Sequence, residues 1–460
     1  MNNRIKQATA PHPSTAAHET IGDLTRRGFL ATSGSLTAAV VAAGAAASVV
    51  GFGGGLLAPR PARAANSSSA RRLKIGVIGC GGRGTGAAIN MLEASDDVEI
   101  VAIGDMFPDR IAGARQELAK LDEPMLGRVK VTDDTVFTGF DAYKKVLASG
   151  VDVVILATPP GFRPTHFAAA VDAGKHVFME KPVAVDPAGV RKVTAAAKLA
   201  GEKKLSVVTG TQRRHEACYL EAMKRVQDGA IGKVLAANVY WNQGSLWMNE
   251  RQPNWSDMEW QLRNWLYFTW LSGDHICEQH VHNLDAAAWF MGDSPKSASG
   301  QGGRQVRISP AYGHGFDHFA VDFEYADGRR VSSYCRQIDG CSNQVEEIIY
   351  GTDGTMKLSS GRAEIMGKNA WKWKGEQLNP YVQEQKDLVA SIMGGAYLNE
   401  GERIAKNTMM AIMGRMSAYT GKNVSWDFAM GSKLDTMPTT LELASLPTPP
   451  VAVPGTTPLV

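Results

Sequence analysis

A glycine-rich loop is the first group of residues whose spacing suits ligand binding. It has the pattern Gly79-x-Gly81-x-x-Gly84 and follows a short apolar run that ends at Ile78. A loop of this kind between a strand and a helix lets backbone N–H groups approach a dinucleotide pyrophosphate. We expect the cofactor to be bound by Gly79, Gly81, Gly82, Arg83 and Gly84.

An acidic residue, Asp105, follows the next apolar run, Val98 to Ile103. It lies about 20 residues beyond the loop, where a carboxylate accepts hydrogen bonds from the adenosine ribose and disfavours a 2′-phosphate. The pattern therefore predicts NAD. Arg83 and Arg110 could still receive a 2′-phosphate, which leaves NADP as the alternative.

Two polar elements lie where later strands of the same sheet would end. Thr158 and Pro159 follow the apolar run Val151 to Ala157, and Glu180-Lys181-Pro182 follows the run His176 to Met179. In open α/β sheets the carboxyl ends of the strands face the ligand crevice. An ammonium there can contact both a nicotinamide and a substrate hydroxyl, so we expect Lys181 to do both.

Residues 273–285 carry a titratable stripe. If they form one helix, His275, Glu278, His282 and Asp285 fall within roughly 80° of one another. His282 is the expected general base, because an imidazole has an intrinsic pKa of about 6.5 and can take a hydroxyl proton at neutral pH. Glu278 would orient that ring or a substrate hydroxyl.

A metal site is the competing interpretation of this stripe, with His275, His280, His282 and Glu278 as ligands. On a helix His280 points to the opposite side, so the stripe supplies only two histidines. We therefore predict no metal.

The glycine loop, Ala157-Thr158-Pro159, Ala173-Gly174-Lys175-His176-Val177 and Glu180-Lys181-Pro182 together resemble the Gfo/Idh/MocA oxidoreductase family. The resemblance implies an α/β protein: an N-terminal Rossmann domain with a doubly wound parallel sheet, then a C-terminal α/β domain with a large, mainly antiparallel sheet. It also implies that Lys181 serves cofactor and substrate, and that the open face of the second sheet forms a homodimer or homotetramer.

The family's acid-x-x-x-His-x-x-Asp pattern is matched by Glu278, His282 and Asp285. The chain departs from it at Glu278, where Asp is more usual, and at His280, where Gly is more usual. The cofactor site is expected to include Thr158, Pro159, His166, Glu180, Lys181 and Gln212. The substrate site is expected to include Lys181, Arg213, Trp265, His275, Glu278 and His282.

Aromatic residues are concentrated between these elements. Six of the ten tryptophans in the chain are Trp241, Trp247, Trp255, Trp260, Trp265 and Trp270. Their flat apolar faces suit stacking against a sugar ring. Packing in the protein or a subunit contact would explain them equally well.

The N-terminal residues predict export. Arg26 and Arg27 precede an uncharged Ala/Gly-rich run, a pattern typical of a twin-arginine signal, and a small-residue cleavage site lies near Ala64. The expected partner is the twin-arginine export machinery, and the expected location is the periplasm or the exterior. An uncleaved membrane anchor is the alternative, although the run is weakly apolar for a span.

Charge and cysteine content exclude other classes. Residues 1–64 hold six Lys and Arg against two Asp and Glu, so the net charge of +3 becomes −1 without them. No basic run supports nucleic-acid binding. Five cysteines, an odd and sparse set, do not indicate a disulfide framework, though Cys335 and Cys341 could pair.

The expected organisation is a signal peptide at 1–64, a linker at 65–71, a Rossmann domain at 72–211, a substrate and oligomerisation domain at 212–430, and a proline-rich tail, extended or disordered, at 431–460. The expected function is an exported NAD(P)-dependent oxidoreductase acting on CH–OH groups of a small carbohydrate, with a tightly bound cofactor. An NAD-dependent redox-neutral glycosidase and a non-catalytic sugar- or nucleotide-binding protein are the alternatives.

Overall fold

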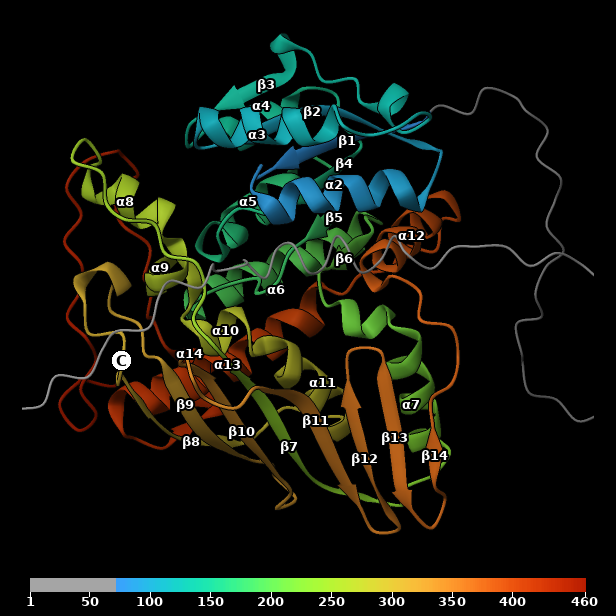
Figure 1. The fold of residues 1–460 in the computed structure, drawn as a ribbon, viewed down its shortest axis with the longest axis vertical. Helices are drawn as coiled ribbons and strands as arrows, with labels where there is room; N and C mark the ends of the chain where they lie inside the picture. The colour runs from blue at the N-terminus through green and yellow to red at the C-terminus, as the bar shows by residue number, and fades with distance from the viewer. Residues whose placement is uncertain (1–71) are drawn as a thin grey trace, which may run out of the picture. The chain divides into compact units, whose positions relative to one another are not determined.

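A computed structural model describes residues 72–460 (Figure 1). The predicted signal peptide, 1–64, and linker, 65–71, lie outside the described residues and stay predictions. The described chain contains a six-stranded sheet followed by a nine-stranded sheet. This arrangement is the α/β fold class expected from the sequence.

The six-stranded sheet is parallel, with strand order β3-β2-β1-β4-β5-β6. The order reverses between β1 and β4, so a crevice opens there at the carboxyl ends of the strands. The strands are β1 Leu73–Ile78, β2 Val98–Asp105, β3 Val136–Thr138, β4 Val153–Leu156, β5 His176–Met179 and β6 Val207–Thr209.

Helices cover both faces of this sheet, because its strands are apolar on both sides and each face must be buried. One face packs against α2 Gly82–Ala94, α3 Pro108–Leu118 and α12 Pro380–Met393. The other packs against α4 Ala142–Ala148, α5 Arg163–Asp172 and α6 Pro187–Glu202. The short 3₁₀ turns η1 Leu126–Arg128, η2 Asp133–Thr135 and η3 Pro160–Phe162 complete the connections.

The nine-stranded sheet has the order β14-β13-β12-β11-β7-β10-β9-β8-β15. Its strand pairs are antiparallel except β7 with β10. The strands are β7 Val234–Gln243, β8 Ser297–Gly303, β9 His318–Glu324, β10 Arg330–Gln337, β11 Gln344–Gly351, β12 Gly354–Ser359, β13 Arg362–Gly367, β14 Trp371–Lys372 and β15 Val424–Ser425. The turn at Asp327-Gly328 joins β9 and β10 into a hairpin.

The remaining helices connect the two sheets or cover the second one. They are η4 Gln212–His215, α7 Ala217–Gln227, α8 Asp257–Arg263, η5 Trp265–Tyr267, α9 Thr269–Ser272, α10 His275–Glu278, α11 Val281–Met291, η6 Pro310–Tyr312, α13 Gly401–Thr420 and α14 Trp426–Gly431. Although α12 comes late in the chain, it returns to the first sheet beside α2 and β6 (Figure 1). Its buried Leu388 and Val389 belong to the core around β1 and β2.

One expected helix is broken. Residues 273–285 form α10 and α11, because the amide of His280 reaches back to the carbonyl of His275 and the amide of His282 bonds to Gln279. The four titratable side chains of the predicted stripe meet different partners. Glu278 contacts Lys181, whereas Asp285 pairs with Arg214 and Arg403 and His275 packs against Phe319.

The C-terminal residues pack in an extended form. Beyond α14 the chain has no regular helix or strand, yet the amide of Gly455 bonds to Thr420, and Ser432 donates to the carbonyl of Val460. Of the two sequence alternatives for this tail, extended or disordered, the structure has the extended one.

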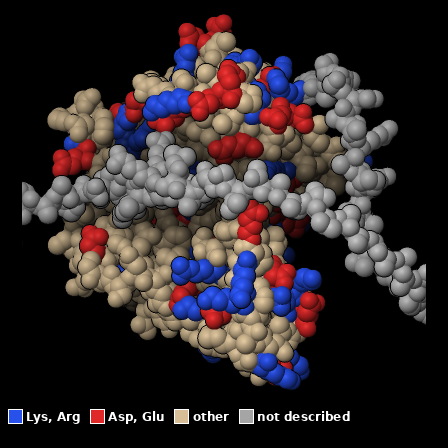
Figure 2. All heavy atoms as spheres, turned by 45° about the vertical axis from the view of Figure 1, so that its right-hand side comes forward, with Lys and Arg blue, Asp and Glu red and all other residues tan. Residues whose placement is uncertain are grey.

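The cysteines are all free, including Cys335 and Cys341, so the pair that the sequence left open is not formed. Across residues 72–460 no helix has the length and apolar character needed to cross a bilayer. Figure 2 shows Lys and Arg side chains interspersed with Asp and Glu over the visible face.

Candidate active site

The glycine loop has the backbone that a dinucleotide needs. Gly79 has φ +100°, and a Cβ at Gly84 would lie 1.7 Å from the carbonyl oxygen of Gly79. Both positions therefore require glycine. Around Gly81 and Gly82 an added Cβ would meet nothing within 4 Å, which leaves an open cradle at the N-terminus of α2. These features fit a pyrophosphate bound by backbone N–H groups.

A cavity of about 500 Å³ runs along this cradle. Of the predicted site residues, those that line it are Gly79, Gly81, Gly82, Arg83, Asp105, Thr158, Pro159, His166, Glu180, Lys181, Trp265 and Glu278. They come from both halves of the chain. The structure thus brings the glycine loop, the strand-end residues and one residue of α10 to the same space.

Asp105 organises the loop at the end of β2. Its carboxylate accepts hydrogen bonds from the backbone N–H of Cys80 (2.7 Å) and of Phe107 (2.9 Å). Burial raises its pKa. The side chain therefore joins the glycine loop to the turn after β2, and it lies where the adenosine ribose is expected.

His166 and Thr158 form the wall beside β4. Thr158 Oγ1 lies 3.2 Å from His166 Nδ1, and Arg163 donates to the carbonyl of Thr158 (2.7 Å). The imidazole stacks between Tyr143 and Phe162, at centroid distances of 4.2 and 5.8 Å. Burial lowers the pKa of His166 to about 3. This histidine is therefore neutral at physiological pH and shapes the wall of the cavity.

Lys181 and Glu278 meet at the cavity. Lys181 Nζ lies 3.0 Å from Glu278 Oε1 and 2.5 Å from the carbonyl oxygen of the same residue. Their side chains are only 11% and 9% exposed. A nearly buried ammonium and carboxylate at one wall can donate to and accept from a substrate hydroxyl. Next to them, Glu180 Oε1 accepts from Arg83 Nη2 (2.5 Å) and Nε (2.8 Å).

His282 is buried close to this pair without lining the cavity. Its ring stacks on Trp241 at 5.5 Å, and its Nδ1 has no hydrogen-bond partner. Burial, followed by the positive charges of Lys181 and Arg213, holds the pKa of His282 well below its ordinary value. The imidazole is therefore neutral, and the lowered pKa makes it a weak proton acceptor.

Besides His282, four predicted residues lie away from the cavity lining: Gly84, Gln212, Arg213 and His275. Arg213 pairs with the buried Glu347, which also accepts from Tyr219 (2.7 Å) and Asn283 (2.8 Å). His275 packs edge-on against Phe319, and both its ring nitrogens lack a hydrogen-bond partner.

Several residues on the cavity wall were not in the predicted site. They are Met106, Phe107, Arg110, Phe140, Tyr143, Phe162, Arg163, Trp247, Asn249, Leu262 and Arg263. Those after β2 could have been found from their place beyond Asp105. Those at 247–263 had no signal beyond the concentration of tryptophans, because their position depends on how a long connection folds back.

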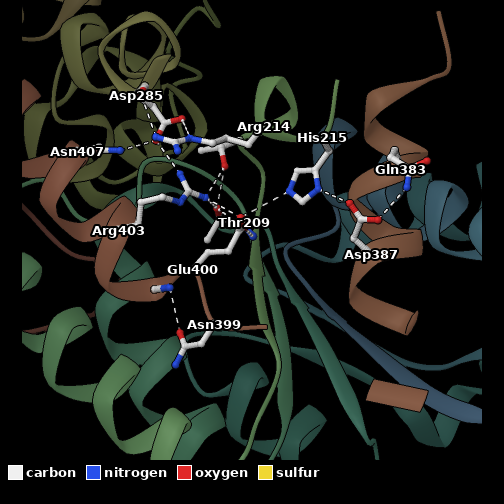
Figure 3. A network of polar contacts seen from close by, with 12 residues as sticks. Thr209, Arg214, His215, Asp285, Gln383, Asp387, Asn399, Glu400, Arg403 and Asn407 are labelled. Atoms are coloured by element: carbon white, nitrogen blue, oxygen red, sulfur yellow. Dashed lines mark hydrogen bonds and ion pairs between the residues drawn. The ribbon is translucent and has the colours of Figure 1, made fainter. Parts of the chain in front are cut away.

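A polar network joins β6, η4, α11 and α13 (Figure 3). Asp285 is its centre: it accepts from Arg214 Nε (2.8 Å), Arg403 Nη1 (2.7 Å) and Asn407 Nδ2 (2.5 Å). The two guanidinium groups lower its pKa in spite of burial. Asp285, which the sequence placed on the same helix face as Glu278 and His282, therefore belongs to a structural ion-pair network.

Glu400 and His215 extend this network to α12. Glu400 accepts from the amide of Thr209 (2.8 Å) and pairs with Arg403 (2.8 Å), and His215 Nδ1 lies 2.6 Å from Asp387. Arg403 and His215 lower the pKa of Glu400 to about 2. Hydrogen bonds to Asp387 and Glu400 outweigh burial and raise the pKa of His215 to about 9.

This network predicts a pH window for stability. The ionised Glu400 stabilises the fold fully above about pH 4.5, and this stabilisation is lost as the pH falls towards 2. The protonated His215 stabilises the fold fully below about pH 6.5, and this stabilisation is lost as the pH rises through 9.

We expect Glu400→Gln to lower the free energy of unfolding most between about pH 4.5 and 6.5, where both groups are charged. Urea unfolding at a series of pH values measures this free energy, and Glu402→Gln, at an exposed position of α13, is the control. A loss of stability that is the same at every pH would contradict the interaction of ionised Glu400 with protonated His215.

Metal ligation has no support in the described part of the chain. Between residues 72 and 460 no three His, Cys, Asp or Glu side chains converge well enough to hold a metal ion.

Family models match the two sheets in turn. Residues 73–209 match the oxidoreductase family with an NAD-binding Rossmann fold, and residues 219–357 match the GFO/IDH/MocA C-terminal domain. Together the matches cover more than half of the chain. This chain belongs to the Gfo/Idh/MocA oxidoreductase family. As a member of it, the protein is an oxidoreductase with an NAD-binding Rossmann domain.

Characterised members of the family are similar at low identity. Inositol 2-dehydrogenase of Rhizobium meliloti is 24% identical over 297 residues, 63% of this chain and 76% of the relative. 2,7-Anhydro-N-acetylneuraminate hydratase of Escherichia coli is 26% identical over 253 residues, 54% of this chain and 63% of the relative. The solved aldose-aldose oxidoreductase of Caulobacter crescentus shares the fold, with a TM-score of 0.61 and 18% identity over 77% of this chain and all of that one.

Proposed function

We propose that this Gfo/Idh/MocA oxidoreductase oxidises a hydroxyl-bearing carbon of a small sugar or sugar-like alcohol. The observation that carries the proposal is the Lys181–Glu278 pair on the wall of the glycine-loop cavity. The inositol dehydrogenase relative acts on an alcohol of this kind, according to its name. Trp247 and Trp265 on the same wall add aromatic faces suited to a sugar ring.

The chain's own residues would bind and deprotonate the substrate hydroxyl. Lys181 donates to the substrate oxygen, and Glu278 holds the ammonium in place. Glu278 accepts the hydroxyl proton, because its carboxylate lines the cavity, whereas the expected base His282 lies outside the lining and its lowered pKa disfavours protonation. The carbon–oxygen single bond becomes a carbonyl as the proton and a hydride leave. A bound nicotinamide supplies the hydride acceptor.

We further propose that the protein is exported and holds its cofactor tightly. The twin-arginine pattern at Arg26 and Arg27 supports export, and free NAD is expected to be scarce outside the cytoplasm. NAD is favoured over NADP because Asp105 lines the cavity at the end of β2, where the adenosine ribose is expected. Recovery of the protein from the cytoplasm alone would refute export.

A homodimer or homotetramer is proposed on the open face of the nine-stranded sheet. Tyr240 and Tyr334 stack there at 5.5 Å, and Asn238 bonds to the hydroxyls of Tyr240 and Tyr350. Tyr334 is 41% exposed. Aromatic side chains of this kind are enriched at interfaces. A monomer in sedimentation experiments would refute it.

The function is tested by mixing the protein with NAD and a panel of aldoses, inositols and glycosides while absorbance of the reduced nicotinamide is recorded. We expect reduction with at least one sugar or inositol. A burst limited to one equivalent would still support oxidation, with a retained cofactor. Free sugar released from a glycoside without net reduction would instead identify a redox-neutral glycosidase. If neither reduced nicotinamide nor free sugar forms, the chain is a non-catalytic sugar- or nucleotide-binding protein.

A further inference from the structure

A long connection from the second half of the chain reaches the nucleotide cavity. Residues 244–272 leave β7, form α8, η5 and α9, and lead into α10. Figure 1 shows α8 at the side of the molecule, next to the C-terminal tail. Within this connection Trp247, Asn249, Leu262, Arg263 and Trp265 line the cavity. It therefore forms a wall that the Rossmann sheet does not provide.

The connection is fixed at the adenosine end by Arg263. Its guanidinium makes two parallel hydrogen bonds to Asp109 of α3, from Nη1 (3.1 Å) and Nη2 (3.0 Å). It also lies 3.9 Å above the ring of Phe107, and its Nε donates to Glu259 (2.9 Å). Phe107, Arg110 and Arg263 line the cavity just beyond Asp105, where the adenosine ribose is expected.

A second attachment lies at the other end of the connection. The carbonyl oxygen of Trp270 lies so close to Gly161 that a Cβ there would come within 2.1 Å of it. The rings of Phe162 and Trp270 meet edge to face at 5.9 Å. The connection is thus held to the Rossmann half both after β2 and after β4.

An apolar cluster fills the space between these attachments. Its buried members are Phe107, Phe162, Met258, Trp260, Leu262, Leu266, Tyr267, Phe268, Trp270 and Leu271. Only the first two come from the Rossmann half. Trp255, Trp260 and Trp270 therefore pack in this cluster, whereas Trp247 and Trp265 line the cavity.

The C-terminal tail supports α8 from its outer side. The amide of Met258 bonds to the carbonyl of Ala444 (3.1 Å), and Gln261 donates to the carbonyl of Leu446 (2.6 Å). Asp257 accepts from the amide of Leu446 (3.1 Å). These hydrogen bonds attach α8 to the tail.

We propose that residues 244–272 form a clamp over the adenosine end of the nucleotide cavity, with the Arg263–Asp109 pair as its latch, and that the clamp slows release of the cofactor. This deepens the proposed tight retention, but it rests on the nucleotide site and not on the sugar chemistry. Release requires the wall at Arg263 to move away from α3. Breaking the latch makes that movement easier.

The test is the rate of NADH release from the full chain. Stopped-flow mixing of the NADH complex with excess NAD follows the loss of nicotinamide fluorescence excited through tryptophan. Arg263→Gln and Asp109→Asn should each raise the release rate about fivefold, the upper end for a partly exposed ion pair. The double variant should release no faster than the single ones, because both remove the same contact. Because the side chain of Asp109 is 57% exposed, Asp109→Asn should fold as the wild type does.

Arg115→Gln is the matched control. Like Arg263→Gln it removes one positive charge, but from α3, where Arg115 pairs with Asp133 away from the clamp, and it should leave the release rate unchanged. Unchanged release in Arg263→Gln and Asp109→Asn, or equal acceleration in the control, would overturn the clamp. Absence of NADH binding by the wild type would overturn it together with the nucleotide site. A negative sugar panel with normal NADH release kinetics would instead refute only the proposed substrate.

Discussion

Replacing Lys181 by methionine is expected to lower turnover about a thousandfold, within the range for loss of a proton-transferring or oxygen-binding group. The ammonium is nearly buried at the cavity wall and is held by two oxygens of Glu278. Methionine fills similar volume without a donor. NADH binding should change much less than turnover, because the glycine loop and Asp105 bind the other end of the cofactor. Steady-state rates and NADH fluorescence titration measure the two effects separately.

The control for this variant is Lys175→Met. Lys175 precedes β5, whereas Lys181 follows this strand. The ammonium of Lys175 donates to the carbonyl of Val151 (2.8 Å), outside the glycine-loop cavity. Turnover should stay near that of the wild type. If Lys181→Met kept more than about a tenth of the activity, the lysine would not act as a catalytic group. Equal loss of NADH binding would assign Lys181 to the cofactor alone.

Replacing Asp285 by asparagine is expected to lower the free energy of unfolding by about 3 kcal/mol, the usual cost of leaving a buried charge without its partner. Asp285 is buried and pairs with both Arg214 and Arg403 (Figure 3). Asparagine keeps the shape and removes the charge, so two guanidinium groups lose their counter-ion. Urea unfolding followed by circular dichroism measures the change.

Asp133→Asn provides the comparison for an exposed ion pair. Asp133 lies 2.6 Å from Arg115, but its side chain is 89% exposed. Exposed pairs contribute less than about 1 kcal/mol, so this variant should be nearly as stable as the wild type. If both variants lost the same free energy of unfolding, the buried network around Asp285 would contribute no more to stability than an exposed ion pair does.

The tail and the clamp depend on each other in the structure. The sequence showed only a run of prolines and a run of tryptophans, each with two open explanations. Packing decides between them: Trp260 and Trp270 are buried in the apolar cluster, and the tail supplies carbonyl partners to α8. Neither segment has a periodic pattern, so local propensity could not place them.

The sequence alone determined the first sheet, its glycine loop and the acid after β2, because a strand, a tight turn and a helix are set by neighbouring residues. It also placed Lys181 at the end of β5 correctly. The surroundings of Glu278 were harder to predict. Glu278 reaches Lys181 as expected, but the single helix expected over residues 273–285 is broken at His280. Backbone breaks of this kind follow from long-range packing. Only the tertiary structure brings Arg263, 154 residues later in the chain, to Asp109, since no local interaction links residues so far apart.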